Sequence, residues 1–571
     1  MRLKILRIII IIGFILVATQ LIYVQAVKGR YYFDLSTNNR IRVVPLEGWR
    51  GRIFDRNGNT LAENRLSYNV MITPQTKDNS EQLFEFLGKT LNIKKEKLIK
   101  KYQSKKHSSF APVLVAEDIT REQAIVLEEN RFRFSSLLIE ESFERSYPLN
   151  ENSAHIIGYV GKVNDALLKR YKEYGYSPLS SVGITGVEEF YDLNLRGEEG
   201  GYQIEVNSRG QQVRILSIRE PTRGNDITLT IDSRIQEMAH LDMQGRPGAI
   251  IIMDYDNGEI LGMTSSPTFN PNIFVDSKLN DQVTAVIQNP QSPLLNRAIN
   301  GRFPPGSVFK LLVSIGALDS QKINRHTTFF CPGYHELGGK RFGCTAAHNH
   351  QNVIEAIAHS CNVFYYHLGL ILGADSISHY AEMFGLGELT HVDLPHESQG
   401  NMPNSRQGIL LRKRAWFAGD TLNLSIGQGD VLTTPLQLVR MVSLIARDGT
   451  DVVPHLIKEI AGVPVDKYRP EQKVKIGQNI FDIVKEGMRA VVTDEAGTAH
   501  ELYDDRLYIA GKTGTAQSSR NKEHHAWFAG YAKGKNKNIA FCVFLEHGGT
   551  SHNAVAITKE LLFRISDEGL I

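Results

Sequence analysis

Three short strings in the C-terminal half carry side chains that together could perform acyl transfer. They are residues 307–310 (SVFK), 360–362 (SCN) and 512–515 (KTGT). Ser307 offers a nucleophilic hydroxyl, and Lys310 lies three positions later on the same face of a predicted helix, within hydrogen-bonding reach. A lysine can take the serine proton when burial or a neighbouring cation favours its neutral form. The first string therefore predicts chemistry through a covalent serine ester.

The second string would serve the same reaction. The Ser360 hydroxyl could relay a proton between Lys310 and a leaving amine, and the Asn362 amide could hold a substrate carbonyl. A simple helix cap is an equally good interpretation of Ser360. Strings of the same form recur at residues 67–69 and 551–553, and residues 519–522 repeat the spacing of the first string. Each string alone is therefore weak evidence.

The third string occurs once, inside a predicted strand. Lys512 and the hydroxyls of Thr513 and Thr515 could grip a substrate carboxylate, and Gly514 indicates that something approaches the backbone closely. The N–H groups of Thr515 and Ser307 could form an oxyanion hole, and an edge strand also accepts an extended peptide. A glycine bulge in an edge strand is the competing interpretation.

Three of the four cysteines lie close together in the sequence. Cys331, Cys344 and Cys361 fall within about thirty residues, accompanied by His348 and His350. A Cys3His set is a closed tetrahedral zinc arrangement, which would fasten the loop after the nucleophile to the second string. A disulfide and unconnected thiols are the alternatives. The fourth cysteine, in the string IAFCVFLEH, is most simply a buried strand residue.

The N-terminus predicts a membrane anchor. Residues 8–27 are almost wholly apolar and long enough to cross a hydrocarbon core about 30 Å thick. Arg2, Lys4 and Arg7 precede this segment, which predicts a cytoplasmic N-terminus and a chain whose mass lies outside. A cleaved signal peptide is the alternative. The net charge of +3 over 571 residues argues against a nucleic-acid partner.

The rest of the chain predicts α+β architecture. Residues 80–102 have a helical pattern, Thr120 with Gln123 forms a predicted capping box, and residues 256–258 (DNG) predict a two-residue hairpin turn. Strands come first in the C-terminal part, helices fill its middle and strands return at its end, which is typical of helices packed against an antiparallel sheet. The predicted divisions are a tail (1–7), an anchor (8–27), a non-catalytic region (28–221) and a catalytic domain (222–571).

In this order and at these separations, the three strings resemble the penicillin-recognising serine enzymes. The anchor and the strings RGRIFDRNGNTLAEN, HIIGYVG, GITGVEEFYDLNLRGEEG and HAWFAGYA resemble the class B penicillin-binding proteins over nearly the whole chain. WFAGDTLNLSIGQG and ESQGNMPN resemble penicillin-binding protein 2, the elongation type, more than its division paralogue. A class A enzyme is not expected, because the sequence shows no N-terminal glycosyltransferase domain.

The resemblance implies a peptidoglycan D,D-transpeptidase, active in cell-wall elongation and shape, that needs no cofactor for acyl transfer. Ser307 would attack the penultimate D-Ala of a stem peptide, and β-lactams would acylate it as mimics. The fold implied is a pedestal-like region followed by an antiparallel sheet with helices on both sides and an all-helical subdomain. His348 is the implied fourth zinc ligand, and a SEDS-family glycosyltransferase is the implied partner at the bacterial inner membrane.

Three other functions are compatible with the same strings. A division transpeptidase would differ mainly in its partner. A carboxypeptidase or β-lactamase would transfer to water, which the anchor and the large N-terminal region disfavour. A β-lactam sensor or idle scaffold would be expected to have a cytoplasmic effector or to have lost Ser307, Lys310 or Lys512, and all three are present.

Overall fold

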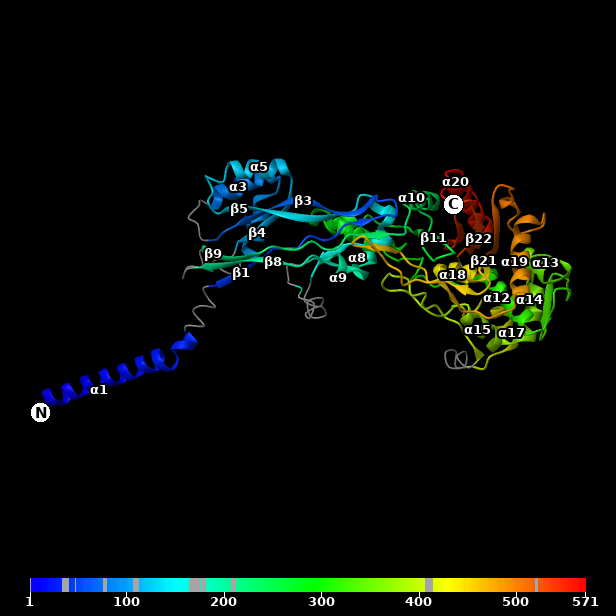
Figure 1. Cartoon of the computed structure of the whole chain (residues 1–571), viewed down its shortest axis with the longest axis horizontal. Helices are drawn as coiled ribbons and strands as arrows, with labels where there is room; N and C mark the ends of the chain where they lie inside the picture. Colours follow the sequence, from blue (N-terminus) through cyan, green and yellow to red (C-terminus); the bar gives the residue numbers. More distant parts are fainter. Residues whose placement is uncertain are drawn as a thin grey trace. The chain divides into compact units, whose positions relative to one another are not determined.

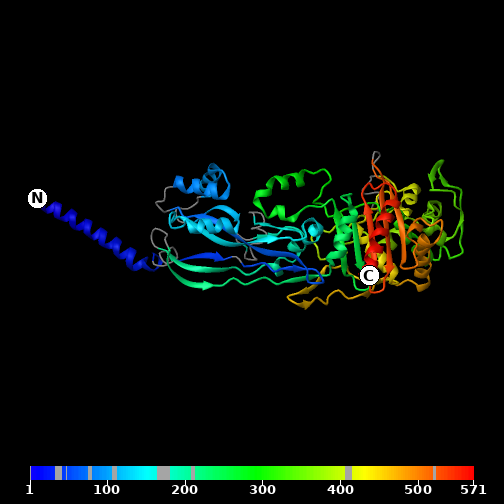
Figure 2. The ribbon, with the colours of Figure 1, turned by 90° about the horizontal axis from the view of Figure 1, so that it is seen from above.

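The structure is a computed structural model that describes residues 2–32, 41–46, 48–74, 80–105, 112–163, 176, 181–206, 212–405, 414–518 and 522–571. It divides into two compact units (Figures 1 and 2). The first unit comprises Met1–Arg50, Asn64–Glu144 and Arg196–Gly224. The second comprises Gly51–Glu63, Arg145–Leu195 and Asn225–Ile571. Most of the string 519–522 lies outside the described residues.

The first unit begins with the predicted membrane segment. Helix α1 (Arg2–Ile22) continues as a π-helical turn over Tyr23–Val27. Leu3–Val27 has a mean hydropathy of 2.6 and is the one stretch among the described residues that is long and apolar enough to span a bilayer. Its side chains are exposed to the surroundings, as a lipid-facing helix requires.

The remainder of the first unit is α+β, as predicted. Helix α5 begins with the predicted capping box, in which Thr120 and Gln123 exchange side-chain and backbone hydrogen bonds. The helix predicted over residues 80–102 is broken at Asn92, which has a left-handed φ of 55°. The helices are α3 (Ser80–Leu91), α4 (Lys95–Lys105) and α5 (Arg121–Glu129). One antiparallel sheet contains β1 (Ile41–Leu46), β8 (Gly200–Val206) and β9 (Gln212–Arg219). In another sheet, β4 (Val113–Ile119) and β5 (Leu137–Ser146) pair with β3 (Thr60–Ile72).

The second unit is built on a five-stranded antiparallel sheet, ordered β12-β11-β23-β22-β21. Its strands are β11 (Gly248–Asp254), β12 (Ile260–Ser266), β21 (Tyr508–Ala516), β22 (His525–Lys533) and β23 (Asn538–Leu545). Every residue of β11 and β12 is buried, without alternation, so both faces of the sheet are covered. β21 forms one outer edge. The predicted β11–β12 hairpin is present, but its connection spans residues 255–259 and is longer than the predicted two-residue turn.

Helices cover this sheet and form a helical region beside β21. α10 (Ser233–Met243) and α20 (Ser551–Asp567) contact each other and the sheet, and α18 (Pro435–Ala446) packs on β11, β22 and β23. The helical region contains α12 (Lys310–Asp319), α13 (Val353–Ala358), α14 (Asn362–Leu372), α15 (Ala374–Met383), α17 (Ala418–Ser425) and α19 (Gln478–Thr493). The α+β fold, with helices on both sides of an antiparallel sheet, is thus confirmed.

Smaller elements complete the second unit. They are α6 (Ala154–Ile157), α8 (Gly186–Phe190), α9 (Asp192–Leu195), α11 (Asn280–Gln288), β2 (Ile53–Phe54), β6 (Val160–Lys162), β7 (Ser181–Gly183), β10 (Ile227–Leu229), β13 (Phe329–Cys331), β14 (Tyr334–Leu337), β15 (Lys340–Gly343), β16 (Asn349–Gln351), β17 (Thr450–Asp451), β18 (Ile457–Ile460), β19 (Val463–Pro464) and β20 (Glu471–Gln472). The pairs β13–β16 and β14–β15 carry the cysteine-rich segment.

Candidate active site

Ser307 lies on a 3₁₀ turn (Gly306–Phe309) that leads directly into α12. The predicted α-helix therefore begins at Lys310 rather than at Ser307. The turn is held from outside, because the Trp527 indole N–H donates to Pro304 O at 3.1 Å. In a 3₁₀ turn positions i and i+3 align, so Ser307 and Lys310 still project from the same side.

The Lys310 side chain is fully buried and fully hydrogen-bonded. Its Nζ donates to Ser360 O at 2.7 Å, Ser360 Oγ at 3.2 Å and Asn362 Oδ1 at 2.7 Å. No hydrogen bond from Ser307 Oγ to Lys310 is present within the described chain, so that part of the sequence prediction is not met in this state. Burial lowers the pKa of Lys310 to about 8, which makes the neutral amine accessible near physiological pH.

Ser360 lies between α13 and α14 and does not cap a helix. The residue at the N-cap of α14 is Cys361. Ser360 has a φ of 57°, a left-handed conformation that is rare outside glycine, asparagine and aspartate. Strained conformations of this kind cluster at functional sites. The Asn362 amide donates to Gly343 O at 3.2 Å while accepting from Lys310, so its orientation is fixed from both ends.

Lys512 is the second fully buried lysine of the site. Its Nζ donates to Thr513 O at 3.2 Å and to Thr513 Oγ1 at 3.4 Å. Burial, with a smaller contribution from the nearby charge of Lys310, holds the pKa of Lys512 well below its usual range. The structure therefore brings the lysines of the first and third strings close enough to interact electrostatically.

Glycines allow the edge strand and the nucleophile turn to approach each other. A Cβ on Gly514 would lie 3.0 Å from Pro305 O and 3.1 Å from Val308 Cγ2. A Cβ on Gly306 would lie 2.9 Å from Thr515 O. The Gly306 separation is shorter than real Cβ contacts and the Gly514 separations are tighter than most of them, so the glycines allow the two backbones to approach this closely. This close approach is what an oxyanion hole shared by Ser307 and Thr515 requires.

Sequence reasoning missed three residues that contact the site. Thr498 Oγ1 lies 2.7 Å from Thr513 Oγ1, the Tyr365 ring lies 5.2 Å from Lys310 Nζ, and Gln428 Nε2 donates to Thr515 O at 3.4 Å. Only Gln428 could have been noticed in the sequence, because it stands between two glycines, a pattern that indicates a turn. Both glycines have a positive φ in the structure. The contacts of Thr498 and Tyr365 depend on tertiary structure alone.

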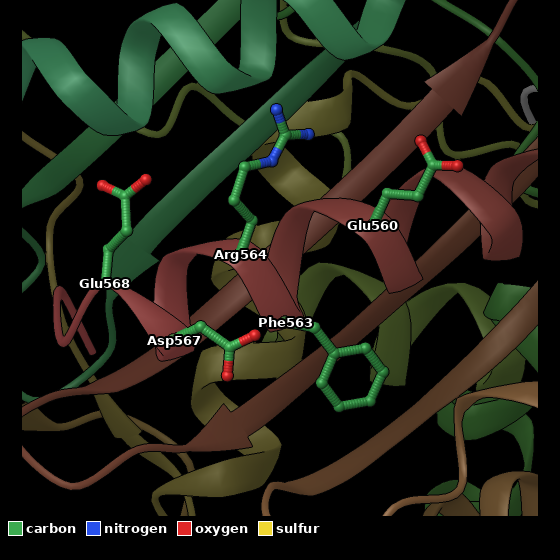
Figure 3. A pocket seen from close by; sticks show the side chains of 5 residues that line it. All are labelled: Glu560, Phe563, Arg564, Asp567 and Glu568. Carbon is green, nitrogen blue, oxygen red and sulfur yellow. The ribbon is translucent and has the colours of Figure 1, made fainter.

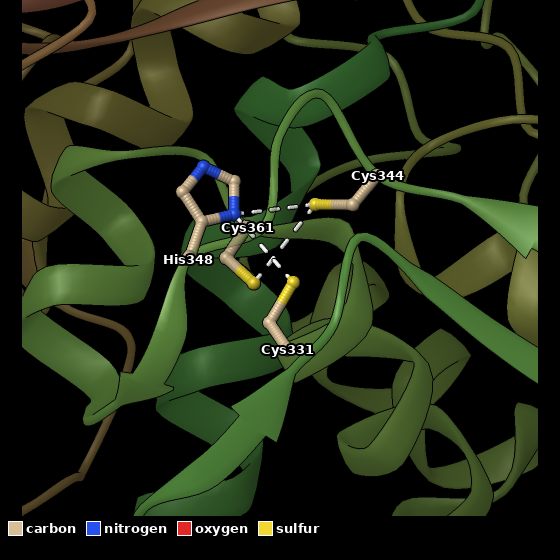
Figure 4. A group of neighbouring side chains, drawn as sticks. All are labelled: Cys331, Cys344, His348 and Cys361. Atoms are coloured by element: carbon tan, nitrogen blue, oxygen red, sulfur yellow. Dashed lines mark hydrogen bonds between the residues drawn. The ribbon is translucent and has the colours of Figure 1, made fainter.

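The cysteine cluster lies beside the second string (Figure 4). Cys331, Cys344, His348 and Cys361 point toward one another, with their ligand atoms all within 4.8 Å. His348 Nδ1 lies 3.6 Å from Cys331 Sγ and 3.4 Å from Cys344 Sγ, and Cys344 Sγ lies 4.0 Å from Cys361 Sγ. Tetrahedral zinc with bonds of about 2.0–2.3 Å separates its ligands by about 3.5–3.8 Å. The four residues therefore fit zinc.

The disulfide interpretation of the cluster is not met. All four cysteines are free thiols, so no disulfide joins them. His350 contacts the Phe330 ring and is not among the four clustered residues. Cys542 is buried in β23, as predicted. Cys344 Sγ accepts the Asn362 backbone N–H at 3.1 Å, and hydrogen bonds with Cys361 and with backbone N–H groups lower the pKa of its thiol, whereas the bond to Cys344 and burial raise the pKa of Cys361. At Cys344 this favours the thiolate that a metal ligand must supply.

A separate surface hollow has no part in this site (Figure 3). It has a volume of about 640 Å³ and is lined along α20 by Glu560, Phe563, Arg564, Asp567 and Glu568. None of the residues of the three strings lines it. The candidate site is the junction of the turn that carries Ser307, the α13–α14 link and β21.

Two family models match the chain. Residues 248–565 match the penicillin-binding protein transpeptidase domain, and residues 45–229 match the penicillin-binding protein dimerisation domain. The peptidoglycan D,D-transpeptidase MrdA of Escherichia coli K12 is 31% identical over 95% of this chain and 90% of its own length.

Solved structures agree. Penicillin-binding protein 2 of Helicobacter pylori, in a complex with MreC, is 28% identical with a TM-score of 0.82 over 93% of this chain and 99% of that chain. A chain from a peptidoglycan synthase complex that coordinates polymerization and crosslinking is 30% identical, with a TM-score of 0.74 over 99% of this chain and 98% of that one. These likenesses favour the elongation enzymes over the division paralogue. The chain belongs to the class B penicillin-binding proteins.

Proposed function

We propose that Ser307 is the nucleophile of this peptidoglycan D,D-transpeptidase and that Lys310 is its base. The observation that carries the proposal is the full burial of Lys310 among three acceptors, Ser360 O, Ser360 Oγ and Asn362 Oδ1. A lysine so placed is readily neutral, and it lies one turn from the only serine that the nucleophile turn presents to β21.

In the proposed acylation, Ser307 Oγ bonds to the carbonyl carbon of the penultimate D-Ala while its proton passes to neutral Lys310. The N–H groups of Ser307 and Thr515 receive the developing oxyanion, and Lys512, Thr513 and Thr515 hold the terminal carboxylate. When the tetrahedral intermediate collapses, the C–N bond breaks and the departing D-Ala nitrogen takes a proton through the Ser360 hydroxyl, which accepts from Lys310 at 3.2 Å.

Deacylation follows the same route in reverse. The amine of a neighbouring stem peptide attacks the ester carbonyl and gives up a proton toward Lys310, and the C–O bond to Ser307 breaks as its oxygen recovers a proton. Asn362, fixed between Lys310 and Gly343, would hold a backbone group of the donor peptide. The outer edge of β21 would pair with that peptide as an added strand.

Zinc in the cluster of Cys331, Cys344, His348 and Cys361 is part of the proposal. Its role would be structural, since four protein ligands close a tetrahedral site. The ligands come from β13, the segment after β15 and the residue before α14. Bound metal would tie this segment to Ser360 and Asn362, which flank Cys361.

The finer division of the chain and its partner are also proposed. Residues 1–7 would form the cytoplasmic tail, 8–27 the inner-membrane anchor, 28–221 the pedestal and 222–571 the catalytic domain in the periplasm. The basic residues in the first turns of α1, Arg2, Lys4 and Arg7, support that orientation. A SEDS-family glycosyltransferase would be the partner. Support comes from the peptidoglycan synthase complex that coordinates polymerization and crosslinking, one chain of which is similar to 99% of this chain.

The proposal is tested by covalent labelling of the purified full chain with a fluorescent penicillin. Ser307→Ala should abolish the label, whereas Ser551→Ala, in the recurring string at the start of α20, should leave it unchanged. Persistent labelling of the Ser307 variant would contradict the assignment of Ser307 as the nucleophile. Cross-linked products from lipid-linked precursors, formed with the glycosyltransferase partner, would separate transfer to an amine from hydrolysis.

A further inference from the structure

A turn outside the three strings contacts both sides of the proposed oxyanion hole. Residues 427–429 (GQG) follow α17. Gly427 O accepts the Gly306 N–H at 2.9 Å, and a Cβ on Gly427 would lie 2.1 Å from Gly306 O. The turn therefore packs directly against the residue before Ser307, at a distance that only glycine permits.

The backbone of Gln428 is fixed on both sides. Its N–H donates to Asn423 O at 2.9 Å, at the end of α17. A few residues later, Thr433 and Phe303 exchange two backbone hydrogen bonds of 2.9 Å, which tie the segment after the turn to the segment before the nucleophile. The Gln428 side chain thus projects from a rigid support.

The Gln428 side chain reaches the edge strand. Its Nε2 donates to Thr515 O at 3.4 Å. Thr515 also supplies the N–H that is proposed to bind the oxyanion, so a group that restrains this residue affects the hole. The hydrogen bond is long, as such bonds often are before substrate tightens a site. The rest of the carboxamide makes no hydrogen bond to any described residue.

We propose that Gln428 is a positioning residue for acylation, whose amide holds Thr515 at a fixed separation from the nucleophile turn. Gln428 then connects the two oxyanion donors through one side chain, since its backbone is anchored beside Gly306 and its amide binds Thr515. The inference rests on the proposed roles of Ser307 and Thr515.

The test measures acylation of the full chain in detergent by a chromogenic cephalosporin, with the maximal rate separated from the dissociation constant of the non-covalent complex. Removing an oxyanion donor outright costs about 10²–10³-fold, so loss of a group that only positions one should cost less. Gln428→Ala should lower the maximal rate about tenfold and change the dissociation constant less than about twofold.

Gln428→Glu supplies a second, independent measurement. Its ionised carboxylate has no proton to donate to Thr515 O, but the protonated acid has one. The acylation rate of Gln428→Glu divided by that of wild type should therefore be low at pH 8 and rise toward pH 5. Because Lys310 and Lys512 titrate in both proteins, their effect on the rate cancels in this ratio. Gln288→Glu, the same change on an exposed glutamine of α11, should keep a ratio near one at every pH.

The outcomes separate the hypotheses. An unchanged maximal rate in Gln428→Ala, a loss confined to the dissociation constant, or a pH-independent ratio in Gln428→Glu would each overturn the positioning role. The second result would mark Gln428 as a substrate contact instead. If Gln428→Ala fails to fold, as judged by its melting temperature, the Gln428→Glu ratio decides. Acylation that survives in Ser307→Ala would remove the underlying proposal instead.

Discussion

The two walls of the proposed active site are held together in different ways. On the wall formed by α12 and the α13–α14 link, buried polar side chains hold one another, with Lys310 donating to three acceptors and Asn362 bound on both sides. On the wall formed by β21, the decisive features are backbone contacts and missing side chains, at Gly306 and Gly514.

This difference predicts different vulnerabilities. On the first wall, removal of a polar side chain should lower the acylation rate, because the buried groups that it contacted lose their hydrogen bonds. The second wall should instead be sensitive to an added methyl group, because its backbones approach each other where side chains are missing. Each of the following experiments tests this difference between the two walls, beginning with the largest expected effect.

Lys310→Met should have the largest effect. The substitution keeps the apolar volume but removes the base and the donor to Ser360 and Asn362. We expect acylation by a fluorescent penicillin to fall by at least about 10³-fold, in the range lost when a nucleophile's partner is removed. Stopped-flow labelling measures the rate, and a wild-type rate would contradict the assignment of the base.

Gly514→Ala should be next. Its new methyl would lie about 3.0 Å from Pro305 O and from Trp527 Cβ, so strand and turn must move apart. A shift of a few tenths of an ångström relieves these contacts, and since a misplacement of about 1 Å costs about 10²-fold in rate, we expect a loss of about tenfold. Gly419→Ala is the matched control, since its Cβ would meet only the Phe342 ring at an ordinary 3.5 Å. Equal rates for the two variants would show that the close approach is unimportant.

The pH dependence of acylation should follow Lys310. Its pKa is lowered to about 8 by burial, and the base must be neutral to accept the Ser307 proton. The rate should therefore rise about tenfold per pH unit below about pH 8 and level off above it. A profile from pH 6 to 10 on folded protein checks this. A rate that stays flat through pH 8 would exclude Lys310 as the titrating base.

Metal removal should have the smallest effect on rate and a clear effect on stability. We expect about one zinc per chain, and Cys331→Ser should lose it, lower the melting temperature by several degrees and reduce acylation less than tenfold. Cys542→Ala, at the cysteine outside the cluster, should keep its zinc. Metal analysis and calorimetry measure these effects, and less than about a tenth of an equivalent in wild type would end the zinc proposal.

The success of sequence reasoning varied with the range of the interactions involved. The capping box at Thr120 and the fold class were predictable, because they depend on local pattern and element order. The helix start at Lys310 and the break at Asn92 were missed because turn geometry, not periodicity, decides them. The contact of Gln428 with Thr515 joins positions 87 residues apart, and a single polar residue between glycines has no periodic signal.

The left-handed backbone of Ser360 has a consequence for how the sequence can change. A non-glycine residue in that conformation costs about 1 kcal/mol, and glycine would relieve it. Glycine would also delete the hydroxyl that accepts from Lys310. The strain relieved is comparable to the free energy of the hydrogen bond lost, so Ser360→Gly should change thermal stability little, whereas selection for cell-wall synthesis should eliminate it. A deep mutational scan under the two pressures would record tolerance at this codon in the first case and loss in the second.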